Sequence, residues 1–302
     1  MSWNDIRWFA AYVGLMTVMI PFALLPPKVA AAVGEKLGIL LSYILSKWNR
    51  KGIQIVASFM PYLSIHSPSA SNSSPEAIIR QVFVNTGIMI AELSRLYFGN
   101  CASLIAAVEF RGLEHYQKAH AQGRGIIGIT AHCGNWELMA LALGLKTNPL
   151  AVVARTMKKD YFSRVLEKLR TRFGNKVIYR DNGVKEMLLF LKSGGLVGIL
   201  PDQVVRAPHG ILVDFFGRPC WTTVMPVKLA LKTGSPILPF FIHRENGRNI
   251  VTIQPELELL PGGSDQERIL DGTIKMNQAI ERHVLQYPTQ WNWLYRRWKG
   301  VH

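Results

Sequence analysis

The chain has 302 residues, of which 49% are hydrophobic and 18% are charged, and its formal net charge is +15. This length suffices for one large α/β domain or two smaller ones. The charged fraction is below the roughly one quarter that is usual in soluble domains, which argues against a fully solvated surface and favours partial burial in lipid. The excess of positive charge must attract polyanions such as anionic lipid headgroups, nucleic acid or an acidic protein.

The N-terminal segment Trp8–Leu25 contains no charged residue and is at the short end of the length needed for a membrane span. More basic residues follow this segment than precede it, so the positive-inside rule places the rest of the chain in the cytoplasm. Pro26 and Pro27 occupy the place of a signal-peptide cleavage site, which favours an uncleaved anchor. A second apolar patch, Gly38–Leu45, is expected to form a helix that lies against the bilayer. The alternative is a buried core helix followed by an ordinary amphipathic helix.

A serine-rich stretch of low complexity, residues 64–75, is predicted to be a loop. It divides the chain into an N-terminal part, residues 1–63, and a main domain, residues 76–302. The first part is expected to hold the membrane anchor and membrane-proximal helices.

Two helix starts are marked by capping residues. Ser74 followed by proline combines a hydroxyl N-cap with the residue preferred at the first helical position, and we expect this helix to run to about Phe98. Ser264 and Glu267 form a capping box, from which a second helix is expected to continue until Pro288.

Six short apolar runs between these helices are bounded by Gly, Pro or Asn and are predicted strands. They are Gly125–Thr130, Leu150–Ala154, Lys176–Tyr179, Leu196–Leu200, Pro236–His243 and Asn249–Gln254. Helical segments separate several of them. This alternation predicts an α/β fold with a mostly parallel, buried central sheet that is flanked by helices.

The most informative stretch is residues 125–143, where an apolar strand ends and Asn135 is well suited to cap the helix that follows. His132 then lies in the strand-to-helix loop and Glu137 in the first helical turn. Catalytic residues of open α/β sheets gather at such strand ends. Five helical positions would place these two side chains roughly 140° apart. They converge only if the loop folds back, which Gly134 permits.

Convergence would let Glu137 hold one imidazole nitrogen of His132 and leave the other as a general base. Such a base can activate an alcohol towards a thioester, and this reaction needs no serine or cysteine nucleophile. The chain has no G-x-S-x-G motif, and Cys133 is expected to point away from the histidine beside it. The alternative is a loop histidine with satisfied partners and a first-turn acid that complements the helix dipole.

Other motifs are missing from the sequence. It contains no H-E-x-x-H motif, no paired C-x-x-C and no phosphate-binding G-x-x-x-x-G-K-[ST] loop, so we expect no metal site and no bound cofactor. The odd number of cysteines, without C-x-x-C spacing, indicates reduced thiols in a cytoplasmic setting.

The H-x-x-x-x-E pattern in its strand–loop–helix context resembles the late acyltransferases of lipid A biosynthesis, the lauroyl/myristoyl acyltransferase family of the lysophospholipid acyltransferase superfamily. Four later stretches resemble that family in the same order. They are an arginine-bearing helix within Val153–Ile178, a P-D-Q element at Leu200–Gln203, an F-F-G turn at Val213–Gly217 and a W-x-x-R-R-x-K element at Trp293–Lys299. With the N-terminal anchor, the resemblance covers nearly the whole chain.

The resemblance implies a glycerolipid acyltransferase-like α/β fold and an O-acyltransferase with His132 as general base and Glu137 as its partner. Arg170 and Asp202 fall on positions that the family uses for activity, and Arg155 is the first arginine after the histidine–glutamate pair. Arg155 and Arg170 could bind a substrate phosphate, and Asp202 could orient an arginine. The alternatives are a solvated basic face for the arginines and a turn-forming aspartate.

The implied donor is an acyl chain on acyl carrier protein, or on CoA, and the implied acceptor is a hydroxyl of a lipid A precursor in the bacterial inner membrane, on its cytoplasmic face. An acidic carrier and an anionic membrane surface both suit the positive charge of the chain. Backbone amides near Gly134–Trp136, or Arg170, are expected to stabilise the oxyanion that forms during transfer.

The chain also departs from the family pattern. Arg155-Thr156 stands where the family often has Arg-Pro, and Tyr295 stands where it often has His. The acceptor therefore stays open, and acyl-CoA-dependent acylation of another membrane glycolipid or lysophospholipid is an alternative. A catalytically silent lipid-binding relative is a further one. A basic nucleic-acid-binding protein is the least favoured, because no binding motif is present, and no nucleic-acid partner is expected.

Overall fold

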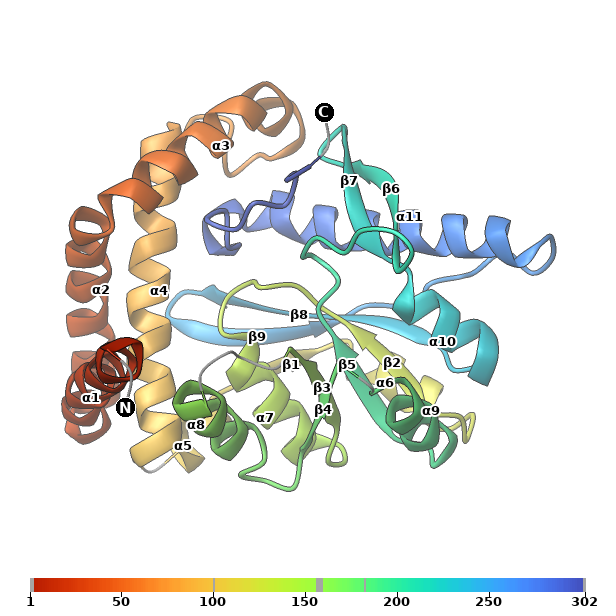
Figure 1. Cartoon of the computed structure of the whole chain (residues 1–302), viewed down its shortest axis with the longest axis horizontal. Coiled ribbons are helices and arrows are strands. Elements are labelled where there is room, and N and C mark those ends of the chain that lie inside the picture. Colours follow the sequence, from red (N-terminus) through yellow and green to blue (C-terminus); the bar gives the residue numbers. More distant parts are fainter. Residues whose placement is uncertain (1–2, 100, 156–159, 182, 301–302) are drawn as a thin grey trace.

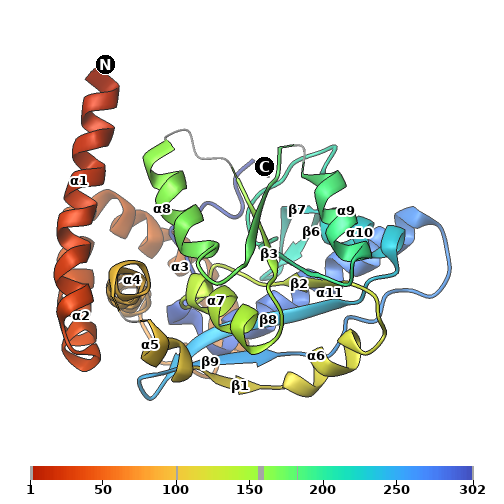
Figure 2. The ribbon, with the colours of Figure 1, turned by 90° about the horizontal axis from the view of Figure 1, so that it is seen from below.

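The computed structural model describes residues 3–99, 101–155, 160–181 and 183–300. Four long helices stand beside an α/β body in which a central sheet is covered by shorter helices (Figures 1 and 2). The long helices are α1 (Trp3–Leu24), α2 (Pro27–Ile44), α3 (Ser46–His66) and α4 (Pro75–Phe98). The predicted anchor and the second apolar patch therefore belong to α1 and α2. Only residues 67–74 of the predicted loop lie outside a helix.

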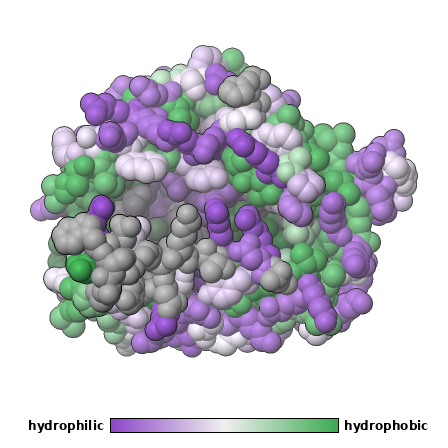
Figure 3. All heavy atoms as spheres, viewed as in Figure 1, coloured by the Kyte–Doolittle hydropathy of each residue, from purple (hydrophilic) through white to green (hydrophobic). Residues whose placement is uncertain are grey.

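Helix α1 has the character of a membrane anchor. Its stretch Ile6–Leu24 is long and apolar enough to cross a membrane, and only 11% of that stretch is buried inside the protein. Helix α4 also passes this test but is 50% buried, and the pair formed by α2 and α3, bent by 91°, could form one further span. Hydrophobic residues appear on the edge of the molecule along which α2 runs (Figure 3). The N-terminal helices therefore form the side of the molecule whose length and composition suit a membrane.

Seven strands form the central sheet in the order β1-β9-β8-β2-β5-β3-β4, with a separate hairpin of β6 and β7. Within the sheet, β8 and β9 pair antiparallel and the other pairs are parallel. The strands are β1 (Glu109–Arg111), β2 (Ile126–Ile129), β3 (Ala151–Ala154), β4 (Lys176–Tyr179), β5 (Leu196–Ile199), β6 (Gly210–Phe215), β7 (Arg218–Thr223), β8 (Ile237–Glu245) and β9 (Arg248–Ile253). The predicted fold class is confirmed, and all six predicted strands are present.

Helices cover both faces of the sheet, and successive side chains of each strand point to opposite faces. Ile126 packs with the core beneath α6 and α7, whereas Ile127 and Ile129 pack with the core formed by α9, α10 and α11. The shorter helices are α5 (Ala102–Ala106), α6 (Leu113–His120), α7 (Trp136–Lys146), α8 (Asp160–Arg170), α9 (Val184–Lys192), α10 (Met225–Thr233) and α11 (Asp265–Gln286). The predicted cap at Ser74 and the capping box at Ser264 are both formed.

Helices α2 and α4 pack against each other through glycines. Gly34 and Gly38 lie one turn apart on α2 and face Gly87 of α4, so that a methyl group on Gly87 would overlap the carbonyl oxygen of Gly34 and the backbone of Gly38. Small residues four apart allow two helix backbones to approach closely, as in membrane helix pairs. This contact fixes the anchor-side helices to α4.

We therefore predict that Gly87→Ala destabilises the protein by about 1–3 kcal/mol, because overpacking of a close backbone contact outweighs the better helix propensity of alanine. The matched control is Gly14→Ala in α1, where a methyl group meets no atom within 4 Å. Thermal unfolding in detergent checks this, and equal melting temperatures for the two variants would contradict the packing argument.

Candidate active site

The parallel register of β2 and β5 creates the site. Ile129 lies opposite Ile199 in this pair. His132 follows Ile129 by three residues, and Asp202 follows Ile199 by three residues, so both leave the same carboxyl edge of the sheet. Side chains at this edge of neighbouring parallel strands can meet across the loops, although 70 residues separate them in sequence.

The Asp202 carboxylate orients His132. Its Oδ1 lies 2.8 Å from Nδ1 of the imidazole, and its Oδ2 accepts hydrogen bonds from the backbone N–H of His132, at 2.8 Å, and from Nε1 of Trp291, at 3.0 Å. Only 3% of the Asp202 side chain is exposed, against 20% for His132. The buried carboxylate therefore fixes the ring while the ring itself still reaches the surface.

The other ring nitrogen of His132, Nε2, faces the side chain of Gln203. The amide Nε2 of Gln203 lies 3.3 Å from it. With a proton on Nδ1 that is donated to Asp202, Nε2 carries the lone pair and can accept a proton. His132 therefore presents a basic nitrogen at the strand edge.

The charge of Asp202 also sets the proton affinity of the ring. Burial lowers the pKa of His132, but the nearby carboxylate and its hydrogen bond outweigh burial, so the pKa is raised above the ordinary value of 6.5. Burial raises the pKa of Asp202, but its partnership with His132 leaves that pKa below the ordinary value of 3.8. The aspartate stays ionised and strengthens the histidine as a base.

Glu137 lies in the first turn of α7, as predicted, behind an Asn135 N-cap that accepts a hydrogen bond from the Leu138 amide at 3.0 Å. The predicted contact between Glu137 and His132 is not what the structure shows. Among the described residues, Glu137 instead binds Arg170 at the end of α8 through two bonds, Nε to Oε2 at 2.8 Å and Nη2 to Oε1 at 2.5 Å. Helix α7 directs the Glu137 carboxylate away from His132. The partner of His132 is Asp202, which follows the neighbouring strand of the sheet, β5.

Trp136 lies between the two ion pairs. Its ring meets His132 edge-on, with centroids 5.0 Å apart, and its Nε1 donates to Oε1 of Glu137 at 3.2 Å. Glu137 is still close enough that its charge contributes to the raised pKa of His132. The site thus consists of the His132 base, which Asp202 orients, and the Glu137–Arg170 ion pair beside it.

Arg155 and Cys133 do not take part in these contacts around His132 and Glu137. Arg155 follows β3 at the same edge of the sheet and is exposed, with no hydrogen bond to the other four predicted site residues within the described part of the chain. Cys133 is buried, and burial raises the pKa of its thiol well above the ordinary value of 9.0. A buried thiol of that kind is a poor nucleophile.

Besides Trp136, two side chains that touch His132 or Asp202 were not among the predicted site residues. Gln203 stands in the P-D-Q element, which could have marked it, since it directly follows Asp202. Trp291 carries no local signal, because its position depends on the C-terminal segment pairing with the His132 loop, where Asn292 N–H donates to the carbonyl of His132 at 3.1 Å.

Comparison with known proteins places this geometry in a family. The sequence profile of the bacterial lipid A biosynthesis acyltransferases matches residues 4–300. The chain is 24% identical to a lipid A biosynthesis acyltransferase of Haemophilus influenzae, over 97% of this chain and 89% of that protein. It is also 24% identical to the lipid A biosynthesis myristoyltransferase of Escherichia coli, over 97% and 88%. A phosphatidylinositol mannoside acyltransferase of Mycobacterium tuberculosis is 26% identical over 62% of this chain and 58% of that protein. The chain therefore belongs to the bacterial lipid A biosynthesis acyltransferase family and is an O-acyltransferase.

Proposed function

We propose that the protein transfers a fatty acyl chain from a thioester, carried by acyl carrier protein, to a hydroxyl of a lipid A precursor, with His132 as general base. The observation that carries this proposal is the imidazole whose Nδ1 faces the buried Asp202, which leaves Nε2, 3.3 Å from the side-chain amide of Gln203, as the basic nitrogen. Relatives that the chain matches over nearly its full length are named for lipid A acylation, which supports the acceptor class.

In the proposed mechanism, Nε2 of His132 takes the proton of the acceptor hydroxyl as its oxygen attacks the thioester carbonyl. The carbon–sulfur bond of the resulting intermediate then breaks, and the imidazolium returns its proton to the leaving thiolate. Asp202 stabilises the imidazolium between these two steps. No covalent acyl-enzyme and no metal ion take part.

The oxyanion needs donors beside the histidine. The Gly134 amide donates to the carbonyl of Gln290 at 2.9 Å, so it is occupied. The amides of Asn135 and Trp136 at the positive end of α7 are the remaining backbone donors of the predicted set. Arg170 uses Nε and Nη2 on Glu137, which leaves Nη1 for an oxyanion or a substrate phosphate. Arg155 is proposed to contact the substrate from the rim of the site.

The proposed location is the cytoplasmic face of the bacterial inner membrane. The weakly buried α1 supports a membrane anchor, and the greater basic load after it supports a cytoplasmic active site. The net charge of +15 would steer an acidic carrier protein to this face. Acylation of a mannosylated phosphoinositide is a second candidate, supported by the partial match to the mycobacterial enzyme.

The function is tested with purified protein, a tetraacylated lipid A precursor or a mannosylated phosphoinositide as acceptor, and both acyl-carrier-protein and acyl-CoA donors, with the product identified by mass spectrometry. We expect acyl transfer by the wild type and a loss of at least about 100-fold in His132→Ala, because a general base contributes that much or more. The control is His120→Ala in α6, which leads into the opposite end of β2. Equal rates in His132→Ala and wild type would end the base assignment, and product on a mannosylated lipid alone would favour the second candidate.

The dependence of activity on pH tests the role of Asp202. A base works only when neutral, so the wild-type rate should fall as the pH drops through the raised pKa of His132. Asp202→Asn removes the main cause of the raised pKa and leaves burial, which lowers the pKa, and the weaker effect of the Glu137 charge. The acidic limb of the profile should therefore move to lower pH, while the maximal rate falls by roughly 100-fold because the tautomer is no longer fixed. An unmoved limb would show that Asp202 does not set this pKa, and Asp181→Asn in an exposed turn serves as the control.

The pair of Glu137 and Arg170 should behave as a unit in stability. Arg170→Gln leaves a buried carboxylate without its cation and should lower the free energy of unfolding by roughly 3 kcal/mol. The double variant Glu137→Gln/Arg170→Gln should recover most of that loss, because no uncompensated charge remains. Thermal melting of the two single variants and the double variant measures this coupling. Strictly additive losses would mean that the two side chains do not depend on each other.

A further inference from the structure

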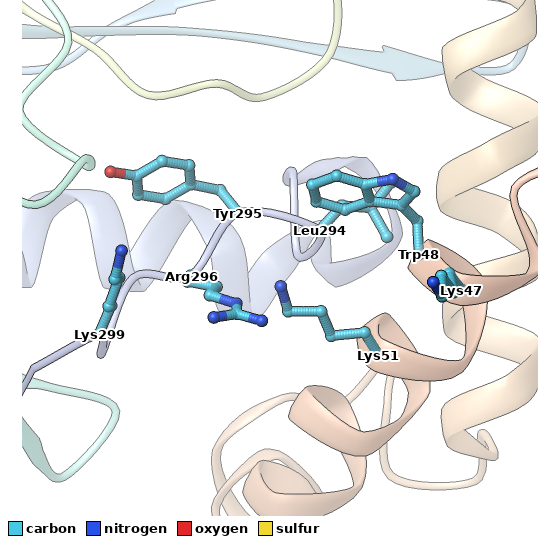
Figure 4. Close-up of a pocket in the computed structure, with 7 residues that line it drawn as sticks. All are labelled: Lys47, Trp48, Lys51, Leu294, Tyr295, Arg296 and Lys299. Carbon is cyan, nitrogen blue, oxygen red and sulfur yellow. The ribbon is translucent and has the colours of Figure 1, made fainter.

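A basic pocket lies between helix α3 and the C-terminal segment. It has a volume of about 660 Å³ and is lined by Lys47, Trp48, Lys51, Leu294, Tyr295, Arg296 and Lys299. The close-up shows Tyr295, Leu294 and Trp48 along one side, and the basic side chains along the other, with Lys51 and Arg296 pointing toward each other (Figure 4). The two walls come from parts of the chain about 250 residues apart in sequence. This group of residues is called the basic pocket below.

The positive charge of the basic pocket is not balanced. Among the described residues, no carboxylate lies within 4.0 Å of its four cationic groups. Lys51 and Arg296 point toward each other across the pocket (Figure 4), so their like charges repel one another. An anion that enters between Lys51 and Arg296 would relieve this repulsion and gain charge-assisted hydrogen bonds.

The basic pocket adjoins the active site through the C-terminal segment. Asn292 donates to the carbonyl of His132, and Tyr295 accepts at its hydroxyl a hydrogen bond from the backbone N–H of Val204 at 3.2 Å, two residues after Asp202. Arg296 follows Asn292 by four residues, so at full extension their Cα atoms lie at most about 14 Å apart. The same short segment therefore contributes to the basic pocket and contacts the His132 loop.

Large hydrophobic side chains are exposed just before and at the α3 residues that line the basic pocket. Tyr43, Ile44 and Trp48, around the bend between α2 and α3, are 74%, 65% and 50% exposed. Lys51 lies over the Trp48 ring, 5.1 Å from its centroid. Exposed aromatic and aliphatic side chains next to lysines are typical of a surface that lies at the headgroup level of a membrane. A ligand of this pocket is therefore one whose anionic group is carried on a lipid.

We propose that the basic pocket binds a phosphate ester of the glycolipid acceptor and so positions its hydroxyl at Nε2 of His132. This proposal rests on the proposed function, because it assigns the pocket to the acceptor of that reaction. The planar guanidinium of Arg296 and the ammonium groups of Lys51 and Lys299 are suited to the tetrahedral oxygens of a phosphate. The pocket would then select phosphorylated acceptors over neutral ones.

The kinetic test compares wild type with Lys51→Ala/Arg296→Ala on two acceptors, the phosphorylated glycolipid and the same lipid after phosphatase treatment. The expected result is a rise of about tenfold or more in KM for the phosphorylated acceptor, with the donor KM and kcat nearly unchanged. The dephosphorylated acceptor should give the same KM with both proteins. Lys185→Ala/Lys192→Ala on α9 removes the same charge elsewhere and should match wild type, and Lys51→Arg/Arg296→Lys should keep most of the selectivity.

Three outcomes would overturn the proposal. An unchanged acceptor KM shows that the pocket does not bind the acceptor. A rise in the donor KM alone assigns the pocket to the phosphate of the donor. An equal rise in KM for the phosphorylated and the dephosphorylated acceptor would mean that the pocket only attracts the protein to an anionic surface.

A binding measurement separates failure of the pocket from failure of the proposed function. Binding of the phosphorylated glycolipid in neutral detergent micelles is measured with His132→Ala protein, with and without the two pocket substitutions. A tenfold weaker binding on substitution supports the pocket even if no donor gives transfer. Equal binding rejects the pocket and leaves the acyl-transfer proposal standing.

Discussion

The site depends on one buried carboxylate, that of Asp202. It binds the backbone and the ring of His132 after β2 and the indole of Trp291 in the C-terminal segment, while its own position is set by β5. A buried charge needs this number of partners to offset the loss of water. The same bonds that keep Asp202 ionised therefore also give the histidine its orientation and its raised pKa, so the fold and the chemistry share a single constraint.

The membrane-side helices are built into the same arrangement. Glu92 of α4 is buried and accepts hydrogen bonds from Asn135, the N-cap of α7, at 2.9 Å and from Asn249 at 2.7 Å, and it forms an ion pair with Arg244. A helix that is itself apolar enough to span a membrane thus holds the start of the helix that carries Glu137. This contact gives a physical reason for an acyltransferase of lipids to place its base beside its anchor-side helices.

Most of the fold could be predicted from the sequence, because apolar runs, caps and helix-breaking residues are local signals. The strand of three residues, β1, and the hairpin with Pro219 in β7 were missed, since neither has a clear local pattern. The side-chain partner of His132 could not be predicted from the sequence. It depends on which strand lies beside β2 in the sheet, and that strand is β5, which is not the next strand in the chain. The partner of His132 is therefore Asp202, and Glu137 is left to Arg170.

The central claim is that neutral His132 carries its proton on Nδ1, toward Asp202, and offers Nε2 as a base. The most direct measurement is a pH titration of ¹⁵N-histidine-labelled protein by NMR, with the His132 signals assigned from their loss in His132→Gln. The account predicts a pKa above 6.5 and the Nδ1–H tautomer in the neutral form. A pKa below 6.5, or a neutral ring protonated on Nε2, would contradict it.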